Sequence, residues 1–88
     1  MKFIVCSDRI VNIAQITEIA VNRSYHTSCI VCIKPDQKEI VIFQEDGTDT
    51  GAANDLFNSI VVWLKGDSHL FFISSWLKKY QQENPKTD

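Results

Sequence analysis

The clearest indication of fold class is the segment YHTSCIVCIKPDQKEIVIFQ (residues 25–44). Two runs rich in β-branched residues, 25–33 and 38–44, flank Pro35-Asp36-Gln37, whose composition is typical of a turn. Two such runs on either side of a short turn predict a pair of antiparallel strands joined as a hairpin.

Upstream of this hairpin the chain carries shorter runs of the same kind. Residues 3–6 and 9–11 are short strand candidates, and positions 16–22 alternate imperfectly between apolar and polar residues. Asn12 favours the start of a turn between these runs. Together with the hairpin, they predict an antiparallel β-meander of four to five strands.

Downstream of residue 45 the apolar period becomes helical. The polar loop 45–51 offers Asp49 or Thr50 as a helix N-cap, and Gly66 is well placed to end that helix. Only Val62 breaks the apolar stripe between them. The stripe of this first predicted helix consists of Ala52, Ala53, Leu56, Phe57, Ile60, Val61, Trp63 and Leu64.

A second helix is expected to begin at Asp67 or Ser68. Its apolar stripe consists of Leu70, Phe72, Ile73, Trp76, Leu77 and Tyr80. The predicted fold class is therefore α+β, an antiparallel meander followed by two C-terminal helices packed on the sheet.

Residues 60–74 also permit another reading. The runs IVVWL and HLFFI flank KGDS, so a β-hairpin is an alternative to two helices. The helical period holds over a longer window, and we therefore favour helices.

Length and composition predict one domain. Eighty-eight residues with 44% apolar content can bury a core without a metal or a disulfide. We expect residues 1–81 to form that domain and residues 82–88, which lack core residues, to form a disordered tail.

The charge balance argues against nucleic-acid binding. The formal net charge is −2, and no run of basic residues exceeds the pair Lys78-Lys79. A nucleic-acid-associated protein remains the alternative function. It would use a local patch made of Lys2, Arg9, Arg23 and Lys34.

Cysteine usage and hydropathy predict a cytoplasmic protein. Three cysteines cannot pair off completely, which argues against a secreted disulfide framework. The first ten residues lack the long apolar region of a signal peptide, and no segment is long enough to span a membrane.

The motif SCIVC (residues 28–32) has the C-x-x-C spacing of zinc and redox sites. In a strand, however, Cys29 and Cys32 point to opposite faces, too far apart for a disulfide or a shared zinc ion. We expect small buried hydrophobic side chains and no cofactor. A zinc site of Cys6, His26, Cys29 and Cys32 would require this strand prediction to be wrong.

Other chemical motifs are incomplete. A calcium loop starting at Asp46 would place Phe57 where a bidentate glutamate is required. Carboxylates surround the glycines of this loop, which disfavours phosphate binding. Only His26 and His69 supply imidazoles, and no catalytic combination is recognisable around them. We expect no enzyme activity.

Several predicted strands are apolar on both faces. The runs 3–6, 29–33 and 40–43 do not alternate, so both faces of these strands should be covered. The two helices could cover both faces of one sheet, or a second subunit could cover one of them.

Aromatic residues concentrate late in the chain. Phe71 lies off the helical stripe, so a monomer with a helix there would expose it. The candidate protein-contact residues are Phe71, Phe72, Trp76, Lys78 and Tyr80. They predict a small non-catalytic regulatory or adaptor protein that binds a protein partner or itself, as a possible homodimer.

Overall fold

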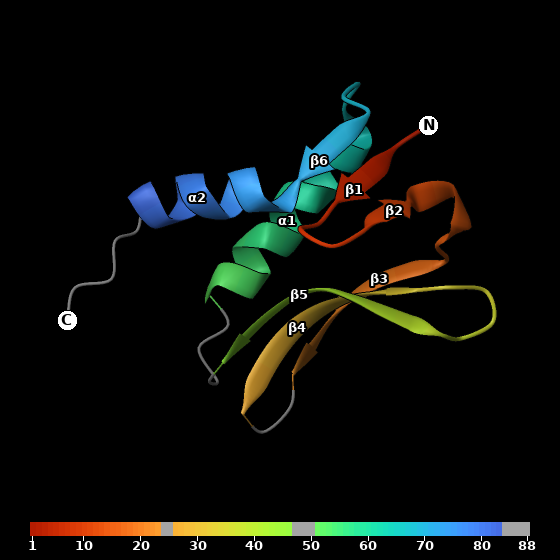
Figure 1. The fold of residues 1–88 in the computed structure, drawn as a ribbon, viewed down its shortest axis with the longest axis horizontal. Coiled ribbons are helices and arrows are strands. Elements are labelled where there is room, and N and C mark those ends of the chain that lie inside the picture. The colour runs from red at the N-terminus through yellow and green to blue at the C-terminus, as the bar shows by residue number, and fades with distance from the viewer. Residues whose placement is uncertain (24–25, 47–50, 84–88) are drawn as a thin grey trace.

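A computed structural model describes residues 1–23, 26–46 and 51–83 of the chain (Figure 1). The elements in chain order are β1 (Phe3–Val5), β2 (Ile10–Asn12), the 3-10 helix η1 (Ile13–Gln15), β3 (Glu18–Arg23), β4 (Thr27–Ile33), β5 (Glu39–Asp46), α1 (Gly51–Lys65), β6 (Leu70–Phe72) and α2 (Ile73–Glu83). The predicted α+β class is confirmed. The predicted caps Asp49 and Thr50 lie outside the described residues, as does the part of the predicted tail beyond Glu83.

The larger sheet is the predicted antiparallel meander, with strand order β3-β4-β5. Its hairpin closes where the Lys34 amide donates to the Lys38 carbonyl at 2.9 Å. Gln37 in this turn adopts a φ of 70°, which is a left-handed conformation. A β-bulge after the Ile30–Phe43 pair inserts Ile42 as an extra residue of β5, and Ile42 is buried.

The first strands form a second sheet instead of extending this meander. Its order is β2-β1-β6, in which β1 pairs antiparallel with β2 and parallel with β6. Between β2 and β3 the chain turns through η1, where the Asn12 side chain accepts a hydrogen bond from the Ala14 amide at 3.0 Å. This turn separates the two sheets, as the ribbon shows (Figure 1).

Residues 66–73 also differ from the prediction. The second helix begins at Ile73, and the preceding residues form strand β6. The alternative hairpin is wrong too, because residues 60–65 belong to α1 and β6 pairs with β1. Gly66 does not adopt the left-handed backbone of a C-cap. Strand formation at 70–72 is a tertiary effect, since its partner β1 lies at the other end of the chain.

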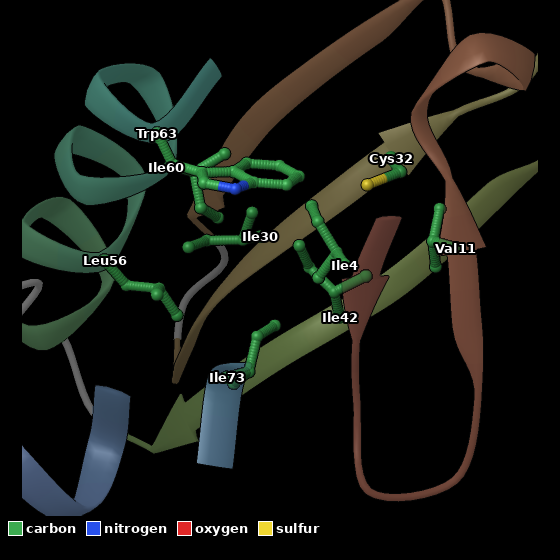
Figure 2. Close-up of a cluster of buried hydrophobic side chains, with 9 residues drawn as sticks. All are labelled: Ile4, Val11, Ile30, Cys32, Ile42, Leu56, Ile60, Trp63 and Ile73. Carbon is green, nitrogen blue, oxygen red and sulfur yellow. The ribbon is translucent and has the colours of Figure 1, made fainter. Parts of the chain in front are cut away.

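Helix α1 packs against the inner face of the larger sheet and forms the core with it (Figure 2). Both sheets contribute, so the core is continuous between them. Its buried side chains are Ile4, Val11, Ile30, Cys32, Ile42, Leu56, Ile60, Trp63 and Ile73. Val62, which broke the helical stripe, is 69% exposed.

The C-terminal end of α1 is held by the N-terminal strand. The Lys2 ammonium donates to the carbonyl oxygens of Gly66 at 2.7 Å and Ser68 at 2.8 Å. It also lies 5.3 Å from the centre of the Trp63 ring. Lys2 thus supplies a donor to backbone carbonyl groups just beyond the end of α1, and at 3.4 Å to the Trp63 carbonyl within its last turn.

The N-terminal end of α1 is held by the larger sheet. The Glu45 carboxylate accepts a hydrogen bond from the Ala53 amide at 2.8 Å, a favourable position for negative charge at a helix start. Arg23 at the end of β3 donates to the Asn54 side chain at 3.2 Å. The helix is therefore fixed to one sheet at each end.

Candidate functional site

Strand parity places two rows of side chains on the side of the smaller sheet that faces away from the core. Ile4, Val11 and Phe71 share a register row and point inward. Their neighbours along each strand must therefore point outward. The outward rows are Ile10, Val5 and Phe72, and next to them Asn12, Phe3 and Leu70.

These outward positions are unusually apolar. We call Phe3, Val5, Ile10, Leu70 and Phe72 the outer apolar face. Ile10 is 66% exposed, Phe72 49% and Leu70 46%. The exposed side of a sheet normally alternates to polar residues, and here only Asn12 does so. A contiguous apolar surface of this kind is typical of an interaction site.

The outward side of the larger sheet has a different character. Its centre holds Val31, which is buried beside its cross-strand neighbours Ala20 and Val41. Charged and amide side chains surround that centre at Glu18, Asn22, Glu39 and Gln44. Both helices lie on the opposite side of this sheet (Figure 1). Of the two alternatives for covering the sheet, the one in which the helices cover both of its faces is therefore wrong.

The five predicted contact residues do not form one surface. Phe72 belongs to the outer apolar face. Phe71 is half-buried against Trp63, with ring centres 5.5 Å apart, so the expectation of an exposed Phe71 is wrong. The prediction assumes a helix, but residues 70–72 form a strand, in which successive side chains point to opposite faces. Residue 71 therefore points inward and residues 70 and 72 point outward.

The other three candidates lie on α2. Trp76 and Tyr80 stack with ring centres 5.0 Å apart, and Trp76 Nε1 donates to Ser59 Oγ of α1 at 2.9 Å. Both rings line a polar groove of about 440 Å³ between the helices. The Lys78 side chain is exposed, and it does not line this groove. The remaining lining residues are Asp55, Ser59, Lys79 and Glu83.

A second groove lies on the other side of Tyr80. It has a volume of about 460 Å³ and a more apolar lining, contributed by β5 and both helices. Phe43, Ala52 and Leu77 provide its apolar walls. Phe43 and Leu77 are also packed against the core, so the groove continues the helix–sheet junction.

The thiols occupy the environments expected for structural cysteines. Cys32 points into the core and Cys29 to the outer side of β4, which confirms that they lie on opposite faces. Burial, with a smaller effect of the nearby Cys6 thiolate, raises the pKa of Cys32 to about 11. Burial also raises the pKa of Cys6, and Asp8 adds to it. Raised pKa values make these two thiols poor nucleophiles at neutral pH.

Other groups that could carry chemistry are dispersed. His26 lies just before β4, and His69 lies between the end of α1 and β6. Across residues 1–23, 26–46 and 51–83, no group of three or more histidine, cysteine or acidic side chains could hold a metal ion.

The proposed basic patch is likewise not assembled. Lys2 binds carbonyl groups at the end of α1, whereas Arg23 binds Asn54 at its start. Arg9 pairs with Asp8 at 3.3 Å, and this hydrogen-bonded pair lowers the pKa of Asp8. Lys34 follows the end of β4 that is remote from Arg23.

The residues of the outer apolar face other than Phe72 were missed by sequence reasoning. The helical period places Leu70 in an apolar core stripe. The short strand candidate at 9–11 does not indicate which side of a sheet Ile10 occupies. A signal existed in LFFI at 70–73, a continuous run of strand-forming residues. That signal could not identify β1 as the partner, and only this pairing defines the face.

Comparisons with known proteins supply no identity. No protein-family model, curated protein or solved structure matches this chain. No helix among the described residues is long and apolar enough to cross a membrane.

Proposed function

We propose that this chain is a small non-catalytic regulatory or adaptor protein that acts through protein–protein contacts. The observation that supports this most is the outer apolar face, where five of six outward side chains are apolar and three of them are about half exposed or more. Such a surface loses unfavourable contact with water when a partner covers it.

The placement of the candidate groups supports a contact role over a catalytic one. The outer apolar face is formed by hydrogen-bonded strands, whereas His26 precedes β4, His69 precedes β6, and the Cys6 and Cys32 thiols have raised pKa values. Phe72 also supplies an aromatic side chain, a type that is enriched in the cores of protein interfaces. A cytoplasmic location remains part of the proposal.

The proposal can be tested with a photo-crosslinking side chain placed in the outer apolar face. A crosslinker at position 72 should capture a protein in the native host, and the same crosslinker at position 62 should not. Val62 is the matched control because it is apolar and more exposed than Phe72, but lies on α1 away from the face. Equal capture from both positions would contradict the proposed contact surface.

A further inference from the structure

We infer that the outer apolar face binds a second copy of this chain, so that two smaller sheets pack face to face around a two-fold axis. This inference rests on the proposed function and names the partner. Phe72 and Leu70 of one copy would lie against the same five-residue face of the other. Such an interface is isologous, because both copies present the same surface.

The absence of charge within the face fits a second copy. None of the six outward side chains is ionisable, so pairing two identical faces buries no charge. Asn12 is the one polar member, and its side-chain oxygen already accepts the Ala14 amide. The face itself carries no charge pattern that would select a different protein.

The charges beside the face are self-complementary. Asp8 and Arg9 lie in the turn that joins β1 to β2, next to the row that contains Val5 and Ile10. Their side chains are 67% and 48% exposed, respectively. A two-fold axis parallel to the strands would bring this turn beside its own copy. Asp8 of each chain could then approach Arg9 of the other, an exchange that an identical partner provides by symmetry.

The available area fits a weak dimer. Ile10, Leu70 and Phe72 are about half exposed or more, and Met1, two residues before β1, is 81% exposed. With Phe3 and Val5, these side chains offer on the order of 500 Å² per copy, or about 1,000 Å² for a symmetric pair. This is near the lower limit for specific interfaces, so we expect a dissociation constant in the micromolar range or weaker.

The test measures the mass of the 88-residue chain by sedimentation velocity and light scattering from micromolar to millimolar concentration. We expect the average mass to rise from one chain toward two. Leu70→Ser with Phe72→Ser should raise the dissociation constant by about tenfold or more. Val62→Ser, the matched control, should leave it unchanged.

Charge exchange tests the orientation of the two copies. Asp8→Arg places like charges at the symmetric contact and should weaken the dimer several-fold. Combining Asp8→Arg with Arg9→Asp should restore it, because the exchanged pair is again self-complementary. Failure of the double variant to recover would overturn the proposed axis.

A measurement on the unaltered chain guards against variants that fail to fold. Amide chemical shifts should change with concentration at residues 1–12 and 69–72, and remain constant in α1. A single-chain mass up to millimolar concentration, or concentration-dependent shifts elsewhere, would overturn the second-copy inference. The proposed contact function would survive that result if position 72 still captured a different protein.

Discussion

At the scale of single residues, the hairpin turn contains one unfavourable backbone conformation. Gln37 has a φ of 70°, a region that residues with a side chain rarely adopt. Asp36 supports the turn, since its side chain accepts the Lys38 amide at 3.1 Å. The backbone of Gln37 therefore costs a small amount of folding free energy, which a residue suited to positive φ would remove.

Gln37→Gly should stabilise the protein by about 0.5–1 kcal/mol. Glycine adopts positive φ without the steric cost, and its greater freedom in the unfolded chain offsets part of the gain. Urea denaturation of the two proteins measures the difference. Gln37→Ala keeps the steric cost and is the control, so equal stabilisation by alanine would contradict this explanation.

A second residue-scale prediction concerns pH. The Cys32 pKa is about 11 in the folded chain, above its ordinary value of 9.0. The folded state therefore retains this proton when the unfolded state loses it. Retention of this proton stabilises the folded state fully below pH 9. The stabilisation is lost as pH rises from 9 to 11, and the free energy of unfolding then falls by up to about 1.4 kcal/mol per pH unit.

Unfolding free energies at pH 8 and pH 10 measure this effect. Cys32→Ala should lower stability at both values but should show a shallower decline with pH. Parallel curves for the two proteins would show that the decline arises from other groups.

Cys29, on the outer side of β4, should react with a thiol reagent faster than Cys32.

At the scale of elements, strand β6 shows which parts of the fold the sequence could predict. The meander β3-β4-β5 and helix α1 follow from local patterns, because hairpin turns and amphipathic periods lie within short segments. Strand β6 has only three residues and depends on β1, so local periodicity assigned Leu70 and Phe72 to the core. In a strand, side chains repeat every two residues instead of every 3.6 as in a helix. Leu70 and Phe72 therefore point outward and Phe71 points inward.

The inward direction of Phe71 and the outward direction of Phe72 can be tested with one substitution at each position. Phe71→Ser should destabilise the protein by about 2–3 kcal/mol, because it removes a ring packed against Trp63 and the core. Phe72→Ser should cost less than about 1 kcal/mol. The two variants share the same change one residue apart, and a helix at this position would give the opposite order in chemical denaturation.

The attachment of α1 gives another element-scale prediction. Lys2→Met keeps the aliphatic stem but removes the ammonium hydrogen bonds and the contact with Trp63. We expect a loss of about 1–2 kcal/mol in thermal or urea unfolding. Lys78→Met on the exposed side of α2 is the control and should change stability by less than about 0.5 kcal/mol.

At the scale of the whole molecule, the two sheets share one core. Ile4 and Val11 come from the smaller sheet, Ile30 and Ile42 from the larger one, and α1 contacts both groups (Figure 2). Trp63 lies at this junction, and its Nε1 has no hydrogen-bond acceptor among the described residues. Packing therefore outweighs the cost of one unpaired polar group there.

A shared core predicts a single unfolding transition. Tryptophan fluorescence reports mainly on the region around α1, whereas far-ultraviolet circular dichroism reports on all helices and strands. The two urea curves should coincide, with one midpoint. A separate transition for the smaller sheet would show that the sheets unfold independently.

The pairing of β1 with β6 also has a consequence for protein synthesis. Phe3 emerges from the ribosome before its partner Leu70, which is made more than 60 residues later. The nascent chain can close the hairpins of the larger sheet while β1 still lacks one neighbour. The last folding step must therefore follow translation of β6, and until then strand β1 presents an unpaired apolar edge of the kind that promotes aggregation.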